Sequence, residues 1–140
     1  MAGIVIVAHT PVASAMLSFV EHTFGALPER IQAVDIPPHE DIKASFDRVL
    51  RAAYRVNTGN GVLILTDVMG ATPANVASKL ESLGPLSGIN SPVIVLAGLN
   101  LPMLMRCVSH RGESLEELAK KALAGGQNGI LRLGAKANQE

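Results

Sequence analysis

Uninterrupted apolar runs predict the strands of this chain. Residues 4–8, 62–66 and 93–97 are almost wholly aliphatic, and residues 31–36 form a weaker run that Pro37 and Pro38 close. A strand covered on both faces has no polar side, so such runs are typical of a parallel sheet buried between two layers. A short final strand is predicted at residues 129–133.

Apolar residues at helical spacing fill the segments between these strands. Val12, Met16, Val20 and Phe24 recur every four positions and predict a helix that stops at Gly25. A second amphipathic helix is expected over residues 42–54. Thr72-Pro73 predicts the start of a third, with the threonine hydroxyl as its cap. A fourth helix follows residues 98–102.

The last helix has its own start and stop signals. Ser114 and Glu117 have the spacing of a capping box, and Gly125-Gly126 predicts the end of the helix. Strands and helices therefore alternate, which requires right-handed crossovers and a parallel sheet with helices on both faces. The expected fold is α/β, three-layered αβα, in one domain over residues 1–140. The predicted strand at 129–133 has to pair at a sheet edge or with another chain.

Composition excludes several classes of function. Twelve basic and twelve acidic residues give a net charge of zero, and only four residues are aromatic, so a nucleic-acid interface is not expected. No apolar run approaches the ~20 residues of a membrane span. The single cysteine, Cys107, excludes an internal disulfide. We expect a soluble, cytoplasmic protein without membrane insertion.

Candidate chemistry lies at the carboxyl ends of the predicted strands, where open parallel sheets bind their ligands. His9 ends the first strand and Asp67 follows the third. In the 2-1-3-4 order of flavodoxin-like sheets these two would meet, and a carboxylate on one ring nitrogen leaves the other as a nucleophile. Asp67 as a simple turn residue, and His9 as an ordinary surface histidine, are the alternatives.

The start of the third helix offers an anion site for the electrophile. Its unpaired N–H groups and its dipole favour phosphate, and Thr72 adds a hydroxyl, while Gly70 and Ala71 keep the backbone accessible. Thr10 is a further candidate for phosphoryl binding. The chain has no nucleotide-binding glycine loop. We therefore expect His9 to take a phosphoryl group from another protein, with no cofactor and no metal.

The remaining histidines are expected to be structural or solvated. His22 lies opposite the apolar stripe of its helix, His110 lies near a helix end, and His39-Glu40-Asp41 is expected to begin a helix. Cys107 is expected in the core. An apolar rim near Met16, Met69 and Met103 is the expected docking surface, although Met103 also fits a packing role.

Three segments together resemble the IIA component of the mannose family of the bacterial phosphoenolpyruvate-dependent sugar phosphotransferase system. They are IVIVAHT with His9, ILTDVMGATPANVASKL with Asp67, and AGLNLPML from Ala97 to Leu104. The resemblance implies that His9 is phosphorylated by the carrier protein HPr and passes the phosphoryl group to a IIB component. It implies that Asp67 orients the histidine and that Thr72, where serine is commoner, holds the phosphoryl group.

The resemblance also implies a homodimer in which the last strand pairs with the partner's sheet. Many family members continue into a IIB domain, whereas this chain ends at Glu140, so we expect a stand-alone IIA component. Two alternatives stay open: the phosphotransferase subunit that serves dihydroxyacetone kinase, and a regulatory binding protein switched by phosphorylation of His9. A flavodoxin-like cofactor binder is disfavoured, because the loops at the strand ends are short and lack aromatic residues.

Overall fold

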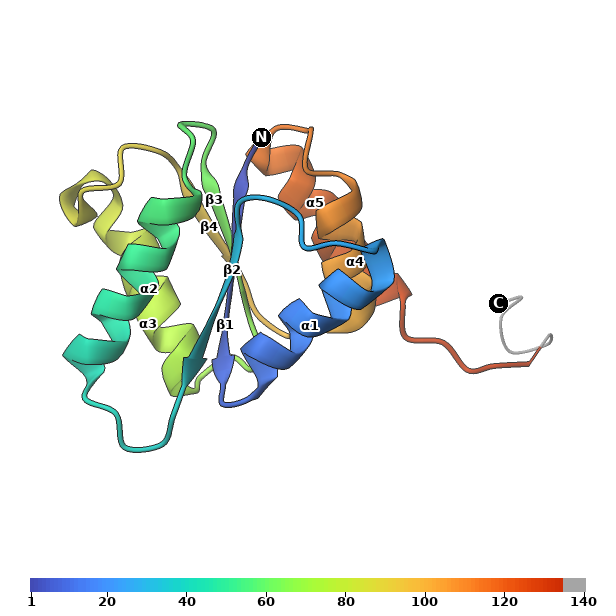
Figure 1. Cartoon of the computed structure of the whole chain (residues 1–140), viewed down its shortest axis with the longest axis horizontal. Coiled ribbons are helices and arrows are strands. Elements are labelled where there is room, and N and C mark those ends of the chain that lie inside the picture. The colour runs from blue at the N-terminus through green and yellow to red at the C-terminus, as the bar shows by residue number, and fades with distance from the viewer. Residues whose placement is uncertain (135–140) are drawn as a thin grey trace.

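The protein is a three-layered α/β structure in which one parallel sheet separates two groups of helices (Figure 1). The computed structural model describes residues 1–134. The strands are β1 (Gly3–His9), β2 (Ile31–Ile36), β3 (Val62–Thr66) and β4 (Val93–Leu96), in the order β2-β1-β3-β4. All three pairings are parallel. The predicted fold class and strand order are therefore confirmed.

The helices cover both faces of this sheet. They are α1 (Val12–Phe24), α2 (Ile42–Val56), α3 (Thr72–Leu83), α4 (Leu101–Ser109) and α5 (Leu115–Asn128), with a short 3-10 turn, η1 (Gly84–Ser87), after α3. Figure 1 shows α2 and α3 on one side of the sheet and α1, α4 and α5 on the other.

Alternation along the strands divides the core between the two faces. In β1, Ile4, Ile6 and Ala8 pack on the side of α1, α4 and α5, whereas Val5 and Val7 pack on the side of α2 and α3. All five side chains are fully buried. This double burial is the reason that the strand sequences carry no polar alternation.

The predicted end of the last helix at Gly125-Gly126 is wrong. Helix α5 continues through Gly125 and Gly126 to Asn128. These glycines face α4: a Cβ on Gly125 would collide with the side chain of Arg106, and one on Gly126 would lie 3.1 Å from the Cε of Met103. They therefore permit close packing of two helices rather than ending one.

Residues 129–133 form no strand in this single chain. The segment leaves α5 and projects away from the body of the molecule (Figure 1), and it pairs with neither edge of the sheet. Ile130, Leu131 and Leu133 are 78%, 62% and 88% exposed. An extended segment without a neighbouring strand has no ladder partners, so the pattern that predicts a strand here is not satisfied within the chain.

Candidate functional site

The strand order brings His9 and Asp67 together. His9 is the last residue of β1, and Asp67 comes directly after Thr66, the last residue of the neighbouring strand β3. The two strands run parallel, with Val7 opposite Thr66. The carboxyl ends of both strands therefore lie at the same edge of the sheet, and the two side chains meet there.

One carboxylate oxygen of Asp67 holds His9 in two ways. The Oδ2 atom accepts a hydrogen bond from the backbone N–H of His9 at 2.9 Å and lies 2.7 Å from the ring Nδ1. The other oxygen, Oδ1, accepts from the backbone N–H of Val68 at 2.9 Å. Two main-chain donors thus fix the carboxylate of Asp67, and this fixed carboxylate orients the imidazole of His9.

This surrounding lowers the pKa of Asp67. Partial burial alone would raise the pKa, but the hydrogen bonds from the backbone and ring of His9 and from the backbone of Val68 outweigh it. The side chain of Asp67 keeps 14% of its exposure. Asp67 is therefore ionised at neutral pH and accepts a hydrogen bond from Nδ1–H, which leaves the free lone pair of the ring on Nε2.

The imidazole is accessible from solvent. The side chain of His9 is 53% exposed, and no hydrogen bond to its Nε2 is found among residues 1–134. The arrangement is an exposed nitrogen nucleophile on a ring held from behind by a carboxylate. It suits in-line attack on an electrophile that another molecule presents.

Helix α3 begins at the same end of the sheet as the tip of β1 (Figure 1). The loop from Asp67 reaches it through Gly70, whose φ of 85° is in the left-handed region that favours glycine. The first intrahelical bond joins Asn75 N–H to Ala71 O, so the N–H groups of the first turn point outward, apart from Pro73, which has none. This helix end is a site of positive potential for an anion.

The predicted role of Thr72 as the helix cap is wrong. The N-cap is Ala71, and no side chain caps the helix. Thr72 is the first helical residue and is exposed, since the preceding loop is extended and places Ala71 at the boundary. Its hydroxyl is therefore not tied to its own helix. Thr10 is also exposed, and its backbone N–H donates to the carbonyl of Ile36 at 3.2 Å.

Two supporting residues were missed in the sequence. Asp35, at the end of β2, accepts the backbone N–H of Ser14 at 3.1 Å and so caps α1 from a neighbouring strand. Asn100 caps α4 by accepting from Met103 N–H at 2.9 Å, and its Nδ2 donates to Gly126 O at 3.0 Å. An aspartate inside an apolar strand, and an asparagine before Leu-Pro, are the signals that point to them.

The other candidate residues lie where they were expected, with one exception. His22 is exposed, His110 is the C-cap of α4 and Cys107 is buried. Met103 is only 3% exposed, so its predicted place on a docking rim is wrong and the packing role is correct. Its position on the inner face of α4, against Gly126, explains the difference.

The exposed apolar residues next to the site are Val68 and Met69, which are 57% and 84% exposed. Both belong to the loop that carries Asp67. Among residues 1–134, no group of three or more His, Cys, Asp or Glu side chains is placed to hold a metal ion. In the same part of the chain, no helix has the length and apolar character needed to cross a membrane.

Comparison with known proteins identifies the same family from sequence and from structure. The family described as PTS system fructose IIA component (EIIA-man) matches residues 3–123. The PTS system mannose-specific EIIAB component of Escherichia coli (strain K12) is 30% identical over 136 residues, which are 96% of this chain and 40% of that protein. The chain thus spans about two fifths of that relative.

Solved structures agree with this match. The phosphotransferase system component EIIA from Streptococcus agalactiae is 29% identical, with a TM-score of 0.81 over 94% of this chain and 97% of that one. The mannose/sorbose specific IIA subunit from Enterococcus faecalis shares the fold, with a TM-score of 0.80 at 20% identity over 95% of each chain. The chain therefore belongs to the EIIA-man family of phosphotransferase system IIA components.

Proposed function

We propose that this chain is a phosphocarrier that accepts a phosphoryl group from phospho-HPr on Nε2 of His9 and passes it to a IIB component. The observation that carries the proposal is the 2.7 Å contact between Asp67 Oδ2 and Nδ1 of an exposed His9 ring. It leaves Nε2 as the nitrogen with a free lone pair. Membership in the EIIA-man family supports the same role.

The reaction needs little covalent chemistry from the protein. The Nε2 lone pair forms a bond to phosphorus while the bond from phosphorus to the donor's histidine nitrogen breaks, and that nitrogen keeps the electron pair. Positive charge grows on the His9 ring, and the Asp67 carboxylate stabilises it through the Nδ1–H bond. Positioning and electrostatics then account for most of the rate.

The start of α3 is the proposed site for the phosphoryl oxygens. The N–H groups of its first turn point outward, and Gly70 and the small Ala71 let the phosphoryl group approach the backbone. The Thr72 hydroxyl, which does not cap the helix, supplies a further donor. Thr10, which follows His9 and is exposed, is proposed as a further hydroxyl donor. Departure of the phosphoryl group to IIB uses the same contacts in reverse.

Phosphorylation by phosphoenolpyruvate with enzyme I and HPr, read by intact mass, tests the proposal. Wild type should gain one phosphoryl group, and His9→Ala should gain none. His22→Ala, which alters an exposed histidine near the end of α1, should label as wild type does. Labelling of the His9→Ala protein, or an unlabelled wild type beside an active donor, would contradict it.

The acceptor is a separate question. We propose a sugar-type IIB component as the acceptor, supported by the similarity to the mannose-specific EIIAB component. Transfer from phosphorylated protein to a purified mannose-family IIB should be faster than transfer to the nucleotide-binding subunit of dihydroxyacetone kinase. The reverse preference would replace the proposed acceptor while leaving the chemistry at His9 intact.

We also propose that the protein is a homodimer. Strand β4 is an unpaired edge of the sheet among the described residues, and the apolar segment 130–133 is exposed beside no strand of its own chain. An antiparallel pairing of this segment with the partner's sheet would satisfy both.

A further inference from the structure

The second half of α2 presents a surface patch far from His9. We define this patch, the α2 patch, as Arg51, Tyr54 and Arg55. Val56, one residue further on, is in contact with Gly3 at the start of β1, whereas His9 ends that strand. Six residues of strand separate the two ends, which is about 20 Å. A molecule bound at the α2 patch would therefore leave His9 free.

The patch has the composition of a protein-binding surface. Tyr54 is 69% exposed, although a tyrosine ring gains from burial, and Leu86 in the neighbouring turn η1 is 87% exposed. Tyrosine and arginine are the residue types most enriched where interfaces concentrate their binding energy. Neither Tyr54 nor Leu86 contributes to the core described above.

A hollow of about 400 Å³ lies beside the patch, between α2 and η1. Its lining is mostly apolar and comprises Leu50, Arg51, Tyr54, Arg55, Ser87 and Gly88. The hollow is shallow and open, while small-molecule sites bury most of their ligand. This shape suits apolar side chains that project from a larger partner.

Two arginine side chains, Arg51 and Arg55, line the hollow and give it a positive charge. The Arg55 guanidinium forms no ion pair within residues 1–134, and Arg51 pairs only with Asp47, four residues earlier on the same exposed helix face. Arg30 Nη1 donates to the Arg55 carbonyl at 3.0 Å, which brings a third guanidinium to the end of α2. Arg51 and Arg55 therefore line the hollow and Arg30 lies at the end of the same helix, in a chain with no net charge.

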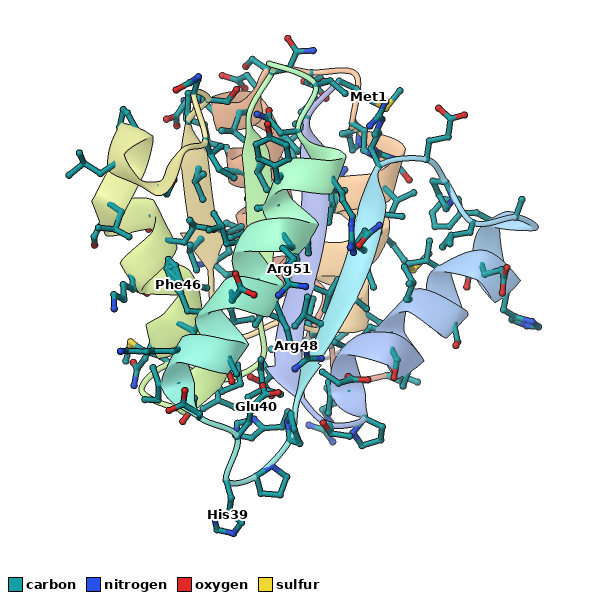
Figure 2. The ribbon with its side chains drawn as sticks, turned by 60° about the vertical axis from the view of Figure 1, so that its left-hand side comes forward. Met1, His39, Glu40, Phe46, Arg48 and Arg51 are labelled. Carbon is teal, nitrogen blue, oxygen red and sulfur yellow. The ribbon has the colours of Figure 1, made fainter. Side chains whose placement is uncertain are left out.

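The row of arginines continues along α2 toward its start. Figure 2 shows Arg51 and Arg48 on successive turns, with Glu40 beside Arg48. Arg48 donates to Glu40 at 2.9 Å, so its charge is neutralised within the protein. Free positive charge therefore concentrates at the carboxyl-terminal half of the helix, next to the hollow.

From these contacts we infer that the α2 patch docks an acidic segment of a partner protein. Apolar side chains of that segment enter the hollow, and flanking carboxylates pair with Arg51 and Arg55, where the planar guanidinium groups give bidentate contacts. Because docking leaves His9 exposed, the same partner binds the phosphorylated and the unphosphorylated protein. The inference stands apart from the proposed phosphotransfer.

Titration of the ¹⁵N-labelled protein with the capped hexapeptide EELFEE, followed by amide NMR shifts, tests this surface. Saturable shifts should be confined to residues near 50–55 and 86–88, and the basic peptide KKLFKK should cause none. The double variant Arg51→Gln/Arg55→Gln should bind at least about tenfold more weakly. Arg106→Gln on α4 is the matched control and should bind as wild type does.

Asp47→Asn supplies the sharper test. It releases Arg51 from the one ion pair that this residue forms within residues 1–134, so the peptide should bind about two- to threefold more tightly. The affinity should fall with added salt and should be unchanged in His9→Ala. Shifts that cluster elsewhere, equal binding of the basic peptide, or no saturable shift would overturn the inference, and none of these outcomes bears on labelling of His9.

Discussion

At the scale of single residues, the contact between His9 and Asp67 depends on more than the two side chains. Asp67 receives donors from two backbone N–H groups, so its oxygens are positioned whether or not the imidazole is present. The ring then needs only to rotate onto a fixed acceptor. The contact joins a histidine at the end of one strand to a carboxylate that follows the neighbouring strand, and the sequence pattern predicts this contact once the strand order is assumed.

Asp67→Ala should slow phosphorylation of His9 by about 10- to 100-fold without abolishing it, because the nucleophile stays while its tautomer and orientation are lost. The initial rate with phospho-HPr measures this effect. Asp47→Ala, which removes an exposed carboxylate on α2, should keep the wild-type rate. An unchanged rate in Asp67→Ala would remove the orienting role from the mechanism.

Cys107 should be inert in the folded protein. Burial raises the pKa of its thiol to about 12, although the nearby Arg111 opposes this. A neutral, buried thiol reacts slowly, so Ellman's reagent at pH 8 should modify wild type only after unfolding. Met105→Cys, at a position 40% exposed on the same helix, should gain one rapidly reacting thiol. Immediate reaction of Cys107 would contradict its place in the core.

The raised pKa of Cys107 also makes the free energy of unfolding depend on pH. The raised pKa means that the unfolded thiol, with an ordinary pKa of 9.0, loses its proton first. The contribution of Cys107 to the free energy of unfolding is therefore fully present below about pH 9 and is lost between pH 9 and 12. Cys107→Ala should lack this component when the free energies of unfolding of the two proteins are compared across that range.

At the scale of elements, the packing of α4 on α5 shows what sequence patterns cannot specify. Gly125, Gly126 and Gly129 were interpreted as stop and strand signals, because glycine usually ends helices. The structure uses them instead where another helix approaches closely. Local sequence does not reveal which distant residue packs against a glycine, so these glycine contacts could not be predicted from the sequence pattern. The four buried strands were predicted correctly, because their burial shows as runs of consecutive apolar residues, whereas the predicted strand at residues 129–133 does not form within the chain.

Gly129→Ala should lower the free energy of unfolding by about 1–3 kcal/mol. A Cβ at this position would collide with the ring of Pro102, which cannot move aside as a flexible side chain does. Gly112→Ala is the matched control: a Cβ there meets nothing within 4 Å, and the change should stay within about 0.5 kcal/mol. Urea denaturation of both variants measures the difference.

At the scale of the whole molecule, the described residues leave the outer edges of both edge strands of the sheet, β2 and β4, and the exposed apolar segment 130–133 without a partner. Periodicity predicted a strand in this segment, and a single chain does not form it. If the segment does form a strand, its partner has to be another chain, as in the proposed homodimer. Pairing patterns within one chain cannot supply that partner.

The double variant Leu131→Glu/Leu133→Glu should convert the proposed dimer to a monomer, because two charges would enter the pairing surface. Light scattering during gel filtration measures the mass of each species. Leu86→Glu, which alters an equally exposed leucine on η1, should remain dimeric. A monomeric wild type, or a dimer that survives both substitutions, would exclude this mode of association.

The half-exposed ring of His9 also determines how long the protein could store what it receives. A phosphoryl group on Nε2 would be held on one side by the proposed contacts at the start of α3 and would face water on the other, so hydrolysis would limit how long it is stored. The occupied fraction of the protein would then follow the supply of donor within that lifetime. The phosphorylated fraction of such a carrier would therefore reflect how much of its donor is phosphorylated at that moment.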